Sequence, residues 1–164
     1  MKSLLIVYHS VTNGTAQMAA AALAGARHAE PELPVRRLAA RDATAQDVLE
    51  AHGYIFATPE NLAAMAGVMK DFFDRTYYPV LDRINGRPYA ALICAGSDGE
   101  NAARQIARIA TGWRLREAAA PLIVRTHAQT PEAIAALKVI PAAELEACRE
   151  LGAAMAAGIA LGIF

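Results

Sequence analysis

The chain has 164 residues, of which 55% are hydrophobic, and 16 basic residues balance 16 acidic ones to a formal net charge of zero. This length fits one domain of ordinary size, and the apolar content excludes a disordered chain. The charge balance gives no reason to expect nucleic acid or an anionic membrane surface as a partner. We therefore expect a single domain over residues 1–164.

The cysteines and the two ends of the chain favour the cytoplasm. Met1–Ser3 lead directly into an apolar run, without the length or cleavage site of a signal peptide. The apolar stretch 151–164 is shorter than the roughly 20 residues that a membrane helix needs. Cys94 and Cys148 lie far apart and form no CxxC pair, so we expect two buried thiols and no metal site.

Apolar runs and helix-forming runs alternate along the whole chain. The predicted elements, in chain order, are a strand at 4–8, a helix at 15–27, a strand at 35–38, a short helix from an Asp42 or Thr44 cap through Ala51, a strand at 53–57, a helix at 67–82, a strand at 89–95, a helix at 101–113, a strand at 121–126, a short helix from Thr130 and a last helix at 142–160.

This alternation predicts an α/β fold with helices on both faces of a five-stranded parallel sheet. Right-handed crossovers make the sheet doubly wound, and we favour the strand order 2-1-3-4-5. In such sheets a ligand binds outside the carboxyl ends of the strands, where the order reverses between strands 1 and 3. The loops after strands 1, 3 and 4 are therefore expected to meet over one patch.

The loop after the first strand has the composition of a phosphate site. Its hydroxyl residues are potential donors, and its glycine allows a close backbone approach where the next helix begins; these residues are Ser10, Thr12, Asn13, Gly14 and Thr15. No Lys-Ser or Lys-Thr pair follows a glycine, and no glycine triad is present, so the two best-known nucleotide loops are unsupported. A plain capped turn is the alternative interpretation.

The loops after the third and fourth strands supply the remaining candidates. The second loop of the site, after the third strand, contains Thr58, Pro59, Glu60, Asn61, Leu62, Ala63 and Met65. The third loop, after the fourth strand, contains Gly96, Ser97, Asp98 and Gly99. For the third loop, the alternative interpretation is a glycine turn in which Ser97 or Asp98 caps the next helix. We interpret His127, after the fifth strand, as an exposed loop histidine rather than a proton donor.

Two segments resemble the flavodoxin family, and more closely its WrbA-like NAD(P)H-dependent quinone reductases. Ala57–Thr76 is similar, without a gap, to the loop and helix of those reductases, through Thr58-Pro59, Met69-Lys70 and Phe73-Asp74-Arg75-Thr76. The first loop resembles the flavodoxin phosphate loop Thr-Gly-Thr-Gly-Asn-Thr, with the order of Asn13 and Gly14 exchanged. Leu62 stands where these reductases often carry an aromatic residue.

The resemblance implies an FMN-binding oxidoreductase. All sixteen candidate residues would then contact FMN: the first loop its phosphate, the second its ring, and the third the carbonyls of its pyrimidine ring. NAD(P)H would be the reductant and a quinone or similar small molecule the acceptor, with no catalytic side chain required because the cofactor carries the chemistry. A flavodoxin-type electron carrier and an interaction module that has lost FMN are the alternatives, and assembly as a homo-oligomer remains open.

Overall fold

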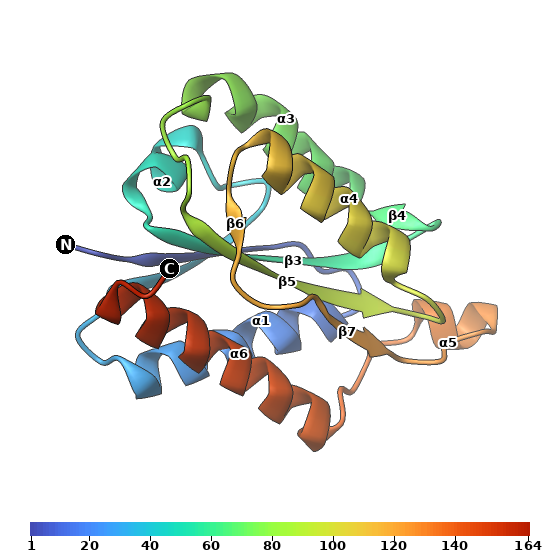
Figure 1. Ribbon diagram of the computed structural model, residues 1–164. Helices are drawn as coiled ribbons and strands as arrows, with labels where there is room; N and C mark the ends of the chain where they lie inside the picture. The colour runs from blue at the N-terminus through green and yellow to red at the C-terminus, as the bar shows by residue number, and fades with distance from the viewer.

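A computed structural model describes residues 1–164 and places every strand in one sheet of seven strands (Figure 1). The path across the sheet is β2-β1-β3-β5, and two short strands, β6 and β7, pair with the far edge of β5. All pairs are parallel except the β3–β4 hairpin. The strands are β1 (Leu4–Tyr8), β2 (Val35–Ala39), β3 (Gly53–Asn61), β4 (Ala64–Met65), β5 (Pro88–Ala95), β6 (Arg116–Glu117) and β7 (Leu122–Arg125).

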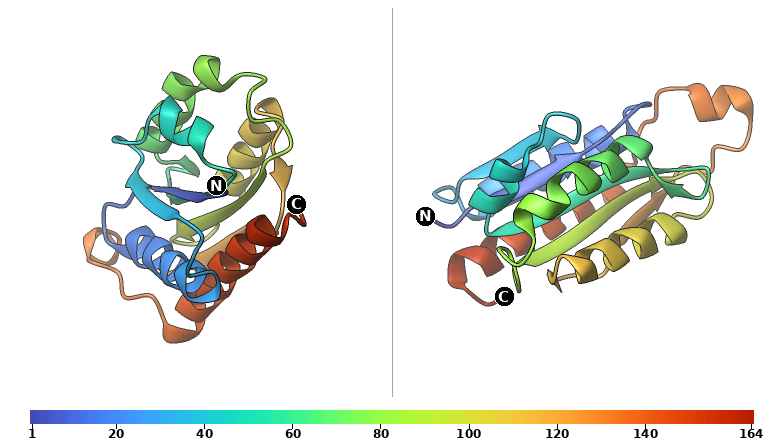
Figure 2. Two further views of the ribbon diagram at one scale, coloured as in Figure 1. Left: turned by 90° about the vertical axis from the view of Figure 1, so that its left-hand side faces the viewer. Right: turned by 90° about the horizontal axis from the view of Figure 1, so that it is seen from above.

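Helices cover both faces of the sheet (Figure 2). Two of them, α1 (Gly14–Ala29) and α6 (Ala142–Leu161), form one layer. The opposite layer contains α2 (Ala45–Glu50), α3 (Gly67–Val80) and α4 (Glu100–Gly112). The short helix α5 (Pro131–Ala135) lies beyond the carboxyl ends of the strands. No helix, including the 20-residue α6, combines the length and hydropathy that crossing a membrane requires.

The predicted order 2-1-3-4-5 is confirmed by β2, β1, β3, β5 and β7, with three differences of detail. The edge strand is interrupted: β6 and β7 pair with opposite ends of β5 and are separated by the segment 118–121, which contains Pro121. A proline has no N–H to donate to a ladder, which explains a break at an edge. The strand predicted at 53–57 continues to Asn61, and β4 turns back on it, so most of the loop predicted after this strand is a hairpin.

The two faces of the sheet bury different kinds of side chain. Successive residues of a strand point to opposite sides, so Leu5 and Val7 face the α3–α4 layer while Leu4 and Ile6 face α1 and α6. Every aromatic pair in the core lies on the α3–α4 side, around Phe56, whose ring centroid is 5.0 Å from that of Phe73. The other side is rich in alanine, which permits its two helices to approach the sheet and each other closely.

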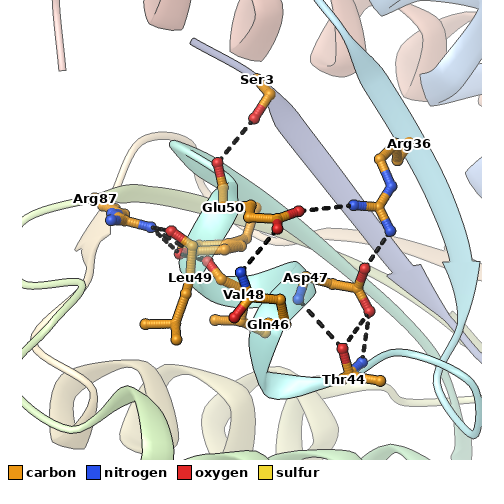
Figure 3. Close-up of polar contacts among 10 residues, drawn as sticks. Ser3, Arg36, Thr44, Gln46, Asp47, Val48, Leu49, Glu50 and Arg87 are labelled. Atoms are coloured by element: carbon orange, nitrogen blue, oxygen red, sulfur yellow. Dashed lines mark hydrogen bonds and ion pairs between the residues drawn. The ribbon is translucent and has the colours of Figure 1, made fainter. Parts of the chain in front are cut away.

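The six-residue helix α2 is too short to be stable alone and is held at both ends (Figure 3). At its start, Thr44 and Asp47 form a reciprocal capping box, which decides between the two predicted caps. Arg36, on β2, pairs with Asp47, so the cap is also tied to the sheet. At its end, Arg87 donates to the carbonyl oxygens of Val48 and Leu49, at 3.2 and 2.8 Å.

The helices α1 and α6 meet at two glycines. A Cβ atom on Gly25 would lie 1.9 Å from the Arg149 carbonyl oxygen, and one on Gly152 would lie 2.0 Å from the Ala22 carbonyl oxygen. Both neighbours are backbone atoms, which cannot move aside as the end of a side chain can. The spacing of this layer therefore depends on glycine at both positions.

We predict that Gly152→Ala destabilises the protein by about 1–3 kcal/mol, because the added methyl group forces the two helices apart. Chemical denaturation of the variant and the parent protein measures the difference. Gly112→Ala is the matched control, since a Cβ at that helix end meets no atom within 4 Å. Equal stability of the two variants would contradict the close packing of α1 on α6.

Alkaline pH is expected to destabilise the fold through Cys148. Burial, with smaller effects from Glu144 and Cys94, raises the pKa of its thiol from 9.0 to about 12. A raised pKa contributes stability that is complete below the unfolded value and is lost as pH rises towards the folded value. The free energy of unfolding is therefore predicted to fall between pH 9 and 12, and to fall less steeply in Cys148→Ala. If the free energy of unfolding fell equally with pH in both proteins, Cys148 would not be the cause of the alkaline destabilisation.

Candidate functional site

The first predicted loop presents backbone N–H groups that the chain leaves free. It joins Tyr8, the last residue of β1, to Gly14, the first residue of α1. Ser10 Oγ accepts a hydrogen bond from the Ala16 amide at 3.1 Å, which fixes the loop against the helix. Asn13 adopts a left-handed conformation and its side chain caps nothing. The amides of Thr12, Asn13, Gly14 and Thr15 therefore remain available at the positive end of the helix dipole.

A buried hydroxyl without a hydrogen bond lies in the same loop. Thr15 is almost fully buried, and its Oγ1 atom has no hydrogen-bond partner. Buried polar atoms are nearly always paired, so an orphaned one needs an explanation, such as a ligand oxygen. Gly14 packs directly on the Cys94 thiol, because a Cβ at Gly14 would lie 2.6 Å from Sγ. Thr15 and Gly14 together form a narrow, polar floor.

The second predicted loop is the β3–β4 hairpin, and its residues divide into two groups. Pro59, Glu60, Asn61, Leu62 and Ala63 line a cavity at the carboxyl edge of the sheet. Thr58 and Met65 are buried elsewhere. The Thr58 hydroxyl accepts from the Ala66 amide at 3.1 Å, and Met65 is packed in the core, so neither residue lines the cavity.

The tip of this hairpin is strained. Leu62 and Ala63 are its two central residues, and their φ angles are 51° and 61°. Asn and Gly are the usual residues at such positions, because a Cβ atom disfavours the left-handed conformation. Two side chains of α4 hold the hairpin: Asn101 donates to the Ala63 carbonyl at 2.5 Å, and Gln105 accepts from the Met65 amide at 2.8 Å. Leu62 is fully exposed at the rim.

Glu60 connects the second predicted loop to the third. One of its carboxylate oxygens accepts from the Gly99 amide at 2.8 Å, and the other accepts from the Ala102 amide at 3.1 Å. A carboxylate bound to the first amides of α4 also compensates the helix dipole. Glu60 thus caps α4 from a distant strand, in place of the predicted Ser97 or Asp98 cap. The Asp98 side chain accepts only from the Glu100 amide, at 3.3 Å.

The third predicted loop reaches the cavity through only part of its length. Gly96 and Ser97 line it, whereas Asp98 and Gly99 do not. The Gly99 amide, predicted as a donor to a ligand, donates to Glu60 within the chain. Asn13 likewise lies beside the cavity rather than on its lining.

These segments enclose one cavity of about 600 Å³, within the range of small-molecule sites. Eleven of the sixteen predicted residues line it. The structure adds residues that the sequence reasoning missed, mainly from the connection between β7 and α6. These additional residues are Val11, Cys94, Ala95, Thr126, Ala128, Ile134, Ala135 and Lys138.

Only two charged side chains, Glu60 and Lys138, belong to the lining. Burial raises the pKa of the Cys94 thiol, while the charge of Lys138 and the Thr15 hydroxyl, which would donate to a thiolate, lower it. The net rise keeps Cys94 protonated. His9 and His127 are both absent from the lining.

The architecture is that of the flavodoxin fold. A flavodoxin structure from the domain Archaea superimposes with a TM-score of 0.77 at 21% identity, covering 98% of this chain and 99% of that one. At this level of identity the likeness shows the fold alone.

Sequence comparison places the chain in a family within that fold. The model of the NADPH-dependent FMN reductase family matches residues 30–124, more than half of the chain, and the chain belongs to this family.

Two curated relatives also match part of the chain. A flavodoxin of Aquifex aeolicus is 32% identical over 99 residues, which is 60% of this chain and 53% of the relative. An NAD(P)H dehydrogenase (quinone) of Acidithiobacillus ferrooxidans is 38% identical over 95 residues, 46% of this chain and 48% of the relative. The matched part of the chain thus spans about half the length of each relative.

We predict that Glu60→Gln destabilises the protein by about 1 kcal/mol, because a neutral amide loses the charge-assisted bonds to α4 and has one acceptor oxygen instead of two. Thermal denaturation measures the loss, and hydrogen exchange at Gly99 and Ala102 should become faster.

Glu146→Gln, in an exposed pair with Arg149, is the control and should change stability little. Unchanged exchange at both α4 amides in Glu60→Gln would show that Glu60 does not cap the helix.

Proposed function

We propose that this protein binds FMN and acts as an NAD(P)H-dependent oxidoreductase that reduces a quinone or a similar small molecule. The observation that carries the proposal is the set of donors at one end of the cavity: the free amides of Thr12, Gly14 and Thr15 and the orphaned Thr15 hydroxyl. Membership of the NADPH-dependent FMN reductase family supports the choice of flavin and reductant. The quinone dehydrogenase relative supports the class of acceptor.

The residues present fit the cofactor. The amides of Thr12, Gly14 and Thr15 would hold the phosphate, since a helix N-terminus stabilises an anion. Pro59 and Leu62 offer an apolar edge for the ring, and the Gly96–Ser97 segment also lines the cavity. No side chain of the chain fills this space, which supports retention of a ligand over loss of the site.

The separate roles of FMN and of the protein follow from this arrangement. A bound FMN supplies the capacity to take a hydride from NAD(P)H and to pass electrons to an acceptor. The residues of the first loop would bind the phosphate, and Pro59 and Leu62 would contact the ring, with Leu62 exposed at the rim. Neither cysteine nor histidine is required to move a proton, so we assign no catalytic side chain.

An electron-carrier role is the second candidate, favoured by the match to a flavodoxin of Aquifex aeolicus. The balanced charge of the chain argues against it, because a carrier benefits from a field that steers it to an oppositely charged partner. The cytoplasm remains the predicted compartment, and the oligomeric state remains open.

The deciding experiment is an absorption spectrum of the protein reconstituted with FMN, followed by anaerobic addition of NADH and of NADPH. Bleaching of the flavin bands by either nucleotide, without a partner reductase, is expected for the oxidoreductase. Retained flavin that neither nucleotide bleaches would favour the carrier, and absence of flavin binding would overturn both.

We predict that Thr15→Val weakens FMN binding by about tenfold while leaving the apoprotein at least as stable. The hydroxyl has no partner without the ligand, so its removal relieves a desolvation cost, whereas the bound phosphate loses a donor. Flavin fluorescence and thermal denaturation measure the two effects.

Thr111→Val, on the exposed side of α4, is the matched control and should leave FMN affinity unchanged. An unchanged dissociation constant in Thr15→Val would contradict the phosphate assignment.

A further inference from the structure

The connection from β7 to α6 is fastened to the first loop at Lys138. The Lys138 amide donates to the Thr12 carbonyl at 2.8 Å. Gln17, on α1, donates to the Lys138 carbonyl at 2.7 Å and accepts from the Ile140 amide at 3.2 Å. Three hydrogen bonds therefore set the position of Lys138 relative to the free amides of the loop.

The side chain of Lys138 carries a charge that no carboxylate neutralises. Its ammonium donates to the carbonyl oxygens of Ala133, Ile134 and Ala136, at 2.9, 2.8 and 2.6 Å, around the end of α5. It takes part in no ion pair within 4.0 Å. Its three donors are satisfied, but the carbonyl dipoles leave its full positive charge in place.

The stem of this side chain lies at the end of the cavity that the first loop forms. The Cβ and Cγ atoms of Lys138 are 3.5 Å from the position a Cβ would take on Gly14. Its charge also acts on Cys94, beneath the loop, where it opposes the rise in the thiol pKa that burial causes. Glu60, the other charged residue of the lining, is bound to the amides of α4. Lys138 is thus the single cation that the cavity offers.

A phosphate monoester carries more negative charge than a helix N-terminus offsets. It carries about −1.5 to −2 charges at pH 7, whereas a helix N-terminus is equivalent to about +0.5. The loop residues 10–15 contain no basic side chain. Lys138, a half-buried residue of the cavity lining, supplies additional positive charge, and such a charge interacts more strongly than one in water.

We propose that Lys138 is a specificity-determining residue that recognises the phosphate monoester, so that the site selects FMN over riboflavin. This inference rests on the proposed binding of FMN. Because a lysine ammonium is a compact point charge, it acts on the phosphate without giving up its bonds to α5. The same side chain therefore shapes the α5 connection and provides the counter-charge.

The test compares Lys138→Met with the parent protein and with Lys70→Met. Lys70 is one of only three lysines in the chain and pairs with Asp74 on the exposed side of α3, outside the cavity lining. The dissociation constants of FMN and of riboflavin for each apoprotein are measured by fluorescence quenching at low and at high salt.

The parent protein and Lys70→Met are expected to bind FMN more tightly than riboflavin. In Lys138→Met we expect FMN binding to weaken about tenfold, riboflavin binding to stay unchanged, and the salt dependence of FMN binding to decrease. Lys138→Arg, which retains the charge, is expected to recover most of the FMN affinity.

Two results would overturn the inference while leaving FMN binding intact: an unchanged FMN constant in Lys138→Met, or an equal weakening of FMN and riboflavin, which indicates a structural role only. A parent protein that binds neither flavin would remove the proposed function and this inference together.

Discussion

The structure depends on a parallel register that brings unpaired backbone groups to one edge of the sheet. Tyr8 pairs with Ala57, and Pro59 pairs with Cys94, so the strands β1, β3 and β5 end side by side. The loop that leaves β1 has no strand to bond with, and the amides of Thr12, Gly14 and Thr15 stay free. Helix α1 begins at the same edge and adds its dipole, while Gly14 lets the backbone settle directly on Cys94. Anion recognition follows from the topology before any charged side chain is considered.

Much of this could be predicted because the signals are local. Continuous apolar runs identify buried parallel strands, and the order of strands and helices limits the sheet to few topologies. The loops after the first three central strands must then meet, whatever their sequence. The residues 10, 12, 14 and 15 and the segments 59–63 and 96–97 were reached by this argument, and all of them line the cavity.

The rest depended on contacts between distant parts of the chain. The bond from Glu60 to the Gly99 amide joins residues 39 positions apart, and local capping rules favoured Ser97 or Asp98 instead. The hairpin at 60–65 was missed because Leu62 and Ala63 are poor turn residues. The residues that the 126–138 connection adds to the cavity could have been expected, because the fifth strand ends at the same edge of the sheet as the others. Its lysine could not be placed, because the hydrogen bonds that position it run to Thr12 and Gln17.

The left-handed pair at the hairpin tip has a consequence for how the rim meets other molecules. Glycine or asparagine would relax the backbone there, yet the chain has two residues that resist the conformation, at a cost of about 1–3 kcal/mol each. Nothing within the protein shields the isobutyl group of Leu62 from water. That group gains free energy only when an outside surface desolvates it, at about 25 cal/mol per Å² of apolar area. The strained turn therefore presents a small apolar surface, and burying that surface contributes free energy only in a complex, not in the isolated chain.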